Sequence, residues 1–406
     1  MRSALVLGII SITSLACSQR RPHGVAVDAS GVGEPPPAAL PSNATAPAAV
    51  LAVAQAAATA WQVEGGGAAL GDRVGLLPAR SHALGGGEWL VLVPIEQQFG
   101  YVTLRVRVGA DGRVADAREV AGLPELEVAR MPRGLREEEV RIGDLRGTVT
   151  WPAGSARVPG VVLIAGSGPQ DRDGTVGPNR PFMDLAWGLA AAGIAVLRHD
   201  KRSFRADHPT TLADEAADAV AALATLAALE RVDADHVFLL GHSLGGVVAT
   251  RAAAGQRVAG LILAAAPARP LEEALLEQVA YLVRWRGGDD AAVSAELARQ
   301  RAAVRASREA FWLDVRAHTV AEALRQLPPT LPFLVVQGER DYQTTAVDVR
   351  RWRELLGPRP AQFRLYPELD HLLMRGQGMA TPKSYGVPGR VERRLIDDVA
   401  TWVLTR

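Results

Sequence analysis

Residues 241–245 restrict the fold of this chain more than any other stretch, because they read Gly-His-Ser-Leu-Gly. They follow a short apolar run, 237–240, and precede residues 246–254, which can continue as a helix. A G-x-S-x-G pattern between a strand and a helix is typical of a sharp turn that exposes a serine hydroxyl above a sheet. Glycine at both ends removes the Cβ atoms that would collide where strand and helix pass each other. We therefore expect Ser243 to be a nucleophile at the N-terminus of a helix, whose dipole favours a developing negative charge.

Two candidate partners for Ser243 follow it, an acid and then a base. Asp341 comes after the strand-like run 332–337, and His371 comes after the strand-like run 363–366. Open α/β sheets place their ligand sites beyond the carboxyl ends of strands, which is where both residues lie. His371 would take the serine proton and later return it to the leaving group, and Asp341 would fix the tautomer of His371.

Backbone N–H groups beside the serine complete the expected site. An oxyanion would accept hydrogen bonds from the N–H of Leu244 and from that of Ser167, which lies in the loop after the first central strand. Other side chains fit less well: Asp370 points away from His371 in an extended segment, and His242 fills a position that packing residues usually occupy. No group of His, Asp and Glu has the spacing of a metal site, so the sequence predicts neither a metal nor a cofactor.

The composition is that of a soluble globular chain. Of 406 residues, 48% are hydrophobic and 22% are charged, and the formal net charge is +1. These values are ordinary for folded soluble proteins, and the length allows two or three domains. Near-neutral charge gives no reason to expect nucleic acid as a partner, and the sequence leaves the oligomeric state open.

Residues 1–17 read as an export signal rather than as part of a fold. Arg2 precedes the apolar stretch 4–12, which is too short to span a bilayer as a mature helix. Residues 14–17, Ser-Leu-Ala-Cys, are similar to a bacterial lipobox, whose cysteine is lipidated. We expect an exported cell-envelope lipoprotein on the periplasmic or surface side, touching the membrane only through Cys17; secretion or an uncleaved anchor is the alternative. Residues 18–46, rich in Pro, Ala and Gly, would form a tether.

Residues 47–124 predict a small α+β domain. An Ala-rich helix over 47–62 precedes strand-like runs at 89–95 and 101–108, and the second run alternates apolar and polar residues. Asp111-Gly112 predicts a turn after it, so that 113–120 can return as a partner strand. We interpret this domain as a packing or substrate-shaping module rather than as a second catalytic centre.

Residues 135–406 alternate strand-like and helical runs, which is the pattern of an α/β sheet flanked by helices. A hairpin at 140–151 leads this region, and a helix at 391–404 closes it. The alternation stops at about 270–327, where helices are expected at 272–286, 291–305 and 320–327. A connection this long inside a compact domain is usually functional, so we expect a helical cap over the site.

The first cap helix carries a broad apolar face that needs a partner. Its spacing puts Leu271, Leu275, Gln278 and Leu282 on one side, with Leu276, Val279 and Val283 beside them. The mouth of the site over Ser243 is the nearest partner by topology. A cap placed there would restrict acyl size and exclude water.

The chain from about residue 137 to its end resembles the α/β-hydrolase superfamily, in the esterase branch related to dienelactone-hydrolase-like enzymes. The matching stretches are GSGPQDRDG, GPNRPFMDLAWGLAAAGIAVLRHDKR, GHSLGG, QGERDYQ and LDHLLM. The preceding module resembles a small domain of unknown function found before some secreted hydrolases. Many relatives have His where Ala165 stands and Gly where Ser203 stands. The resemblance implies the α/β-hydrolase fold, a mostly parallel sheet, and the Ser243, Asp341, His371 triad.

Three functional hypotheses follow. The first is a serine hydrolase that cleaves short-chain or small-acid carboxylic esters through an acyl-enzyme. The second is a peptidase or thioesterase with the same triad, because fold and triad do not fix the leaving group. The third, of a different class, is a catalytically silent binding protein tethered to a membrane.

Overall fold

The computed structural model describes residues 46–63, 70, 72–124, 130–154, 156–205 and 210–406. The predicted export signal at 1–17, including Cys17, and all but the last residue of the predicted tether lie outside these residues. No helix in the described part of the chain is long and apolar enough to cross a membrane.

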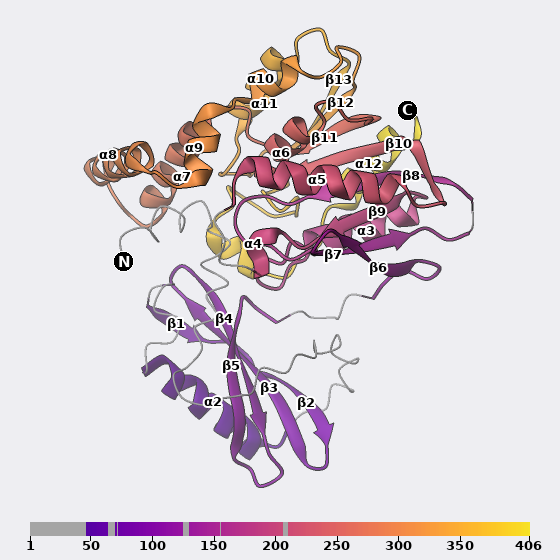
Figure 1. Cartoon of the computed structure of the whole chain (residues 1–406). Helices are drawn as coiled ribbons and strands as arrows, with labels where there is room; N and C mark the ends of the chain where they lie inside the picture. The colour runs from indigo at the N-terminus through magenta and orange to yellow at the C-terminus, as the bar shows by residue number, and fades with distance from the viewer. Residues whose placement is uncertain (1–45, 64–69, 71, 125–129, 155, 206–209) are drawn as a thin grey trace.

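The N-terminal domain is an antiparallel sheet, sheet A, with one helix packed on it (Figure 1). Its strands pair in the order β1-β3-β4-β5, with β2 also on β3. Ala54 and Ala58 of the helix are fully buried against strand residues such as Val91 and Leu104, because small side chains let the helix approach the sheet closely. The elements are α2 (Ala48–Val63), β1 (Arg73–Leu76), β2 (Arg80–Gly85), β3 (Glu88–Gln97), β4 (Gly100–Val108) and β5 (Val114–Ala121).

The second domain is an eight-stranded sheet, sheet B, in the order β13-β12-β11-β10-β8-β9-β7-β6. The six strands from β13 to β9 are parallel, and the β6–β7 hairpin runs antiparallel at one edge. This confirms the predicted fold class. The strands are β6 (Arg136–Ile142), β7 (Leu145–Trp151), β8 (Val158–Ile164), β9 (Ala195–His199), β10 (Val232–His242), β11 (Gly260–Ala264), β12 (Phe333–Gly338) and β13 (Ala361–Tyr366).

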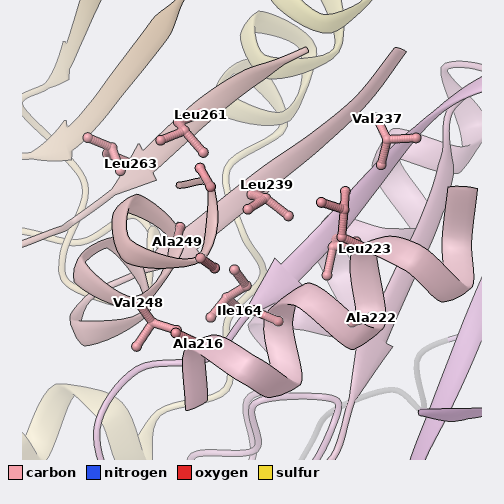
Figure 2. Packing of buried hydrophobic residues seen from close by; sticks show 14 of the residues in the cluster. Ile164, Ala216, Ala222, Leu223, Val237, Leu239, Val248, Ala249, Leu261 and Leu263 are labelled. Carbon is pink, nitrogen blue, oxygen red and sulfur yellow. The ribbon is translucent and has the colours of Figure 1, made fainter. Parts of the chain in front are cut away.

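Helices cover both faces of sheet B, and each strand divides its side chains between two cores. In β10, Val237 and Leu239 face one core, whereas Phe238 and Leu240 face the other, because successive side chains in a strand point to opposite faces. Figure 2 shows the first core, where α5 and α6 pack on the sheet. The covering helices are α3 (Pro181–Ala191), α5 (Leu212–Ala227), α6 (Leu244–Ala252), α11 (Ala346–Leu356) and α12 (Arg393–Leu404).

The insertion after β11 consists of α7 (Leu271–Trp285), α8 (Asp290–Ala306), α9 (Ala310–Ala317) and α10 (Val320–Arg325). The first three helices lie together, with a shared core of Leu275, Val279, Val304 and Trp312 (Figure 1). By contrast, α10 packs through Val320 and Leu324 into the core that covers sheet B. The cap therefore comprises α7, α8 and α9.

Several elements differ from the sequence-based expectation. Strand β10 begins at Val232, so the polar residues 233–236 lie inside it rather than before it. The pairing of β10 with β8 shifts register between Val232 and Val237, and this irregularity accommodates the polar segment. Helix α9 is an addition to the predicted cap, and β1, β2, the short helix α4 (Arg202–Arg205) and a 3-10 helix, η3 (Pro382–Gly386), had no periodic signal long enough to predict them.

Candidate active site

Ser243 lies on the turn between β10 and α6, in the conformation that the glycine pattern predicts. Its backbone has φ 54° and ψ −128°, a region that residues with a Cβ rarely adopt. A Cβ on Gly241 would lie 2.2 Å from the carbonyl oxygen of Gly245, and a Cβ on Gly245 would lie 2.1 Å from that of Ile164. The turn can therefore close only with glycine at both positions.

His371 and Asp341 form a buried pair near the serine. The Nδ1 atom of His371 lies 2.7 Å from Oδ2 of Asp341, and the side chains are 5% and 0% exposed. Asp341 follows β12, and His371 lies in the loop after β13. His371 and Ser243 line the same cavity. The structure thus brings the three predicted triad residues together, and their catalytic roles stay a prediction.

The surroundings of Asp341 keep it ionised although it is buried. Burial by itself would raise its pKa, but the charge and hydrogen bond of His371 and the hydroxyl of Thr344 hold the pKa below its usual range. The N–H groups of Gln343 and Thr344 donate to Oδ1 at 2.7 and 3.1 Å, and the amide of Gln337 donates to Oδ2 at 3.1 Å. An ionised carboxylate fixed in this way sets the tautomer of His371 with Nε2 free to act as a base.

His242 supports the backbone of His371 rather than acting as a base. Burial, together with the nearby charge of His371, lowers the pKa of His242 to about 4, so its ring is neutral at pH 7. Its Nε2 atom lies 2.7 Å from the carbonyl oxygen of His371, which can only accept, so Nε2 carries the proton. The bond fixes the loop that holds His371.

Asp370 is turned away from the histidine ring beside it, as the sequence predicts. Its Oδ1 atom accepts the N–H groups of Leu372 and Met374 at 2.9 and 3.1 Å, which closes the loop around His371. Burial raises the pKa of Asp370 to about 6, because these bonds only partly replace its hydration. Asp341, not Asp370, contacts the ring of His371.

The two predicted oxyanion donors flank Ser243. Leu244 is the first residue of α6, and an N–H in the first helical turn has no acceptor within the helix. Ser167 lies just beyond β8, and no hydrogen bond among the described residues uses its N–H. Both residues line a cavity with Ser243, so both N–H groups are available to a ligand there.

Two cavities meet at Ser243, and Ser167 and Gln343 line both. The first lies between the loop 166–176, Phe182 and His371. The second lies under the cap, and its wall on the cap side is mostly apolar. Its cap residues are Leu271, Ala274, Leu275 and Gln278 of α7 and Phe311 of α9. A molecule with a reacting carbonyl at Ser243 could extend one substituent into each cavity.

The sequence-based prediction for the face of α7 is right for three residues and wrong for two. Leu271, Leu275 and Gln278 face the cavity. Val279 lies instead in the core of the cap, and Leu282 packs into the core beneath α3 and α12. Helix α7 packs in the cap core and against the core beneath α3 and α12, and it also lines the cavity. Its apolar face is therefore wider than the part that reaches the site.

Gln343 is a site residue that the sequence analysis did not single out. It lines both cavities, and Tyr385 of η3 accepts a hydrogen bond from its Nε2 atom at 3.0 Å. Its position two residues after Asp341 in QGERDYQ was the available signal. Among the described residues, no group of three or more His, Cys, Asp or Glu could hold a metal ion.

Comparison with known proteins gives one family and several relatives. Residues 161–380 match the model of the "Alpha/beta hydrolase family". The chain is 36% identical over 287 residues to Esterase EstD of Thermotoga maritima, an alignment that covers 67% of this chain and 68% of that protein.

Solved structures are similar to the chain at lower identity. Est1E from Butyrivibrio proteoclasticus is 15% identical with a TM-score of 0.45, over 66% of this chain and 99% of that one. A dienelactone hydrolase from Anabaena variabilis is 17% identical with a TM-score of 0.42, over 67% and 99%.

Proposed function

Because this chain belongs to the alpha/beta hydrolase family, we propose that it is a serine esterase that cleaves small carboxylic esters through an acyl-enzyme on Ser243. The observation that carries the proposal is the buried pair of Asp341 and His371 beside a serine on a strained strand-to-helix turn. The 36% identity to Esterase EstD supports an ester as the substrate.

The proposed reaction has two halves. The Ser243 hydroxyl attacks the ester carbonyl carbon, its proton passes to Nε2 of His371, and the carbonyl electron pair moves onto oxygen. The N–H groups of Ser167 and Leu244 stabilise that oxyanion. When the intermediate collapses, the carbon–alkoxide bond breaks and the alcohol leaves with the proton from His371. Water then repeats the sequence on the acyl-enzyme, releasing the acid and restoring Ser243.

Asp341 would stabilise the imidazolium that forms in each half. Its pKa lies below the usual range, so it stays ionised at neutral pH and pairs with the charged ring. Burial of the pair strengthens this attraction relative to water.

A reactive phosphonate tests the proposal directly. A fluorophosphonate should label Ser243 and no other residue, and Ser243→Ala should lose both labelling and ester hydrolysis while keeping its thermal unfolding. Turnover that persists in Ser243→Ala would remove this serine from the mechanism. Absence of labelling in the wild type would favour a silent binding protein.

A substrate panel separates the ester from other acyl donors. The specificity constant kcat/KM should be larger for p-nitrophenyl acetate and butyrate than for the matching acetyl and butyryl thioesters or aminoacyl amides. A preference for thioesters or amides would replace the esterase with the thioesterase or peptidase that the same triad allows.

We propose that the apolar cavity under the cap receives the acyl chain. Leu275 lines that cavity and also packs in the cap core, whereas Val279, one turn further along α7, packs in the cap core and does not line the cavity. Leu275→Ala should therefore raise the ratio of kcat/KM for octanoyl over butyryl esters about tenfold, since it enlarges the site by three carbons. Val279→Ala is the matched control, which should lower stability and leave the ratio unchanged.

Export with a lipid anchor is a further part of the proposal, supported by the sequence of residues 1–17. Cells fed radioactive palmitate should label the full chain and not a Cys17→Ser variant. A soluble, unlabelled protein in the medium would favour plain secretion.

A further inference from the structure

Lys201 holds the backbone of the loop that carries Ser167. It lies two residues after the end of β9, and its side chain is 6% exposed. The Nζ atom donates to the carbonyl oxygen of Gly166 at 2.6 Å and pairs with Oε1 of Glu215 at 2.9 Å. Burying an ammonium costs free energy unless it forms its hydrogen bonds, so the contacts with Gly166 and Glu215 hold Lys201 in this position.

The carbonyl that Lys201 binds belongs to the same peptide group as the Ser167 N–H. That peptide is trans, so its C=O and N–H point to opposite sides. Gly166 lies against the nucleophile, because a Cβ added to it would be 3.0 Å from the Cβ of Ser243. The carbonyl is thus directed at Lys201, and the N–H is left without a partner among the described residues, in a loop beside the serine.

A lysine at this position is unusual for this chain. Of 45 basic Lys and Arg residues only Lys201 and Lys383 are lysines. Arginine binds two acceptors with a planar fork, as Arg172 and Arg198 do with carboxylates behind the same loop. Lys201 instead places a compact ammonium between one carbonyl oxygen and one carboxylate oxygen, which need not lie in the plane of a fork.

We propose that Lys201 is a positioning residue for the oxyanion hole: its ammonium fixes the orientation of the Gly166–Ser167 peptide and polarises it, so that the Ser167 N–H becomes a stronger donor. Hydrogen bonds in a chain polarise one another, and a charged donor on the carbonyl withdraws electrons from the amide nitrogen. This inference rests on the proposed function, since it requires an oxyanion at Ser243.

The competing explanation is structural. Lys201 joins β9 to the first turn of α5 through Glu215, and that ion pair alone could account for its burial. A structural role predicts lower stability when the pair is removed, with no selective effect on a tetrahedral adduct. The test must therefore compare ground-state binding with binding of a mimic of the intermediate.

The chain supplies both a variant and a matched control. Lys201→Met alone would leave Glu215 buried and unpaired, so the double variant Lys201→Met/Glu215→Leu replaces the whole pair. The control is Arg202→Met/Asp218→Leu, which removes the neighbouring ion pair to α5, 2.7 Å from Nε to Oδ2 in the wild type. Thermal unfolding of each protein verifies the fold.

We expect the Lys201 double variant to lose about 10- to 100-fold in kcat for p-nitrophenyl acetate, with KM within about twofold. A trifluoromethyl ketone, which forms a tetrahedral adduct with serine, should bind more weakly by the same factor. The control should keep kcat and inhibitor affinity within about twofold.

Three results would overturn the proposal: a folded Lys201 variant with wild-type kcat, a loss of kcat without a loss of inhibitor affinity, or equal losses in the control. Failure of the proposed function looks different, because the wild type would then hydrolyse no ester and bind no trifluoromethyl ketone.

Discussion

The two sides of Ser243 are built from different chemistry. On one side, loop 166–174 is backed by cations, and we call this the ionic side. On the other, loop 338–345 is backed by the rings of Tyr281, Tyr342 and Tyr385, and we call this the aromatic side. Both sides contribute residues to the first cavity at the serine.

The ionic side fixes its loop with charge-assisted hydrogen bonds. Arg172 binds Asp200 and Glu139, and Arg198 binds Asp173 at 2.8 Å. The aromatic side is backed by stacked rings instead. The centroids of the Tyr281 and Tyr342 rings lie 4.7 Å apart, and those of Tyr342 and Tyr385 lie 6.1 Å apart.

The difference matches the charges expected in the transition state. In the proposed mechanism, negative charge develops at the ionic side, where the buried ammonium of Lys201 binds the carbonyl of the Gly166–Ser167 peptide. In the same mechanism, positive charge develops on His371, where a cation would oppose it. The other hydrogen-bond partners of Asp341 are neutral, and Arg340 directs its guanidinium to carbonyl oxygens of residues 368, 377 and 378 instead.

The largest effect is expected for Asp341, the carboxylate on the aromatic side that pairs with His371. Asp341→Asn should lower kcat by about 10³- to 10⁴-fold, because the histidine would lose its tautomer control and its counter-charge. Asp370→Asn is the control and should lower kcat less than tenfold, since its carboxylate contacts backbone N–H groups. Steady-state kinetics decide; a larger loss for Asp370→Asn would reverse the assignment.

On the ionic side, Arg198→Met should cost about 3–5 kcal/mol in the free energy of unfolding. Its guanidinium is 3% exposed and binds Asp173, Glu137 and Thr150. Without it the two carboxylates lose their counter-charge, and Glu137 keeps only the hydrogen bonds that Trp187 and Thr150 donate among the described residues. Arg393→Met is the matched control, because its ion pair with Asp397 is exposed and should contribute less than about 1 kcal/mol. Urea unfolding measures both, and equal small losses would mean that the ionic side is not held by its charges.

A pH series isolates the effect of Asp370, a buried acid that accepts backbone N–H groups in the loop after β13. Asp370 has a folded pKa of about 6 against 3.8 for the free group, so the wild type loses stability as pH rises from about 4 to about 6. The loss is at most about 3 kcal/mol, at 1.36 kcal/mol per pKa unit. Asp370→Asn does not titrate, so its stability relative to the wild type should rise between pH 4 and pH 7.

His242, whose pKa is lowered to about 4, destabilises the fold as pH falls from 6.5 to 4, which is the opposite direction. It is present in both proteins, so its contribution cancels in the comparison. A constant difference between the wild type and Asp370→Asn across this pH range would contradict the prediction.

The smallest expected effect is at the outer end of the aromatic side. Tyr385→Phe removes the acceptor of the Gln343 amide and should cost about 1 kcal/mol of stability and raise KM a few-fold. Tyr366→Phe also loses one hydroxyl bond, to Asp398, but lies away from the cavities, so it should leave KM unchanged. If both variants change KM alike, Gln343 is not positioned by Tyr385.

The sequence predicts best what depends on local geometry. The turn at Ser243 follows from a five-residue pattern, and the alternation of strands and helices is also a local pattern, so this turn and sheet B could be predicted. The close approach of Gly245 to Ile164 is long-range and became visible only in the fold. The contact of Lys201 with Gly166 joins residues 35 apart, and that of Gln343 with Tyr385 joins residues 42 apart. Such contacts depend on the folded positions of loops, which periodic patterns in the sequence do not predict.

The polar start of β10 keeps part of its local preference inside a strand. Residues 233–236 carry the composition of a turn, and they lie where the pairing of β10 with β8 shifts register between Val232 and Val237. Asp233 accepts the N–H of Asp235 and contacts the ring of His236, so the segment forms an irregularity within the strand.

The contact between sheet A and η3 sets the order in which the molecule can be completed. Glu96 of β3 pairs with Lys383 across 287 residues, and the N–H of Leu123 donates to the carbonyl oxygen of Gly386 at 2.7 Å. Synthesis runs from the N-terminus, so the small domain emerges long before its docking surface exists. It can dock only after η3, which follows every strand of sheet B, has been made. The segment that carries Tyr385 is therefore the last part of the active site to be assembled.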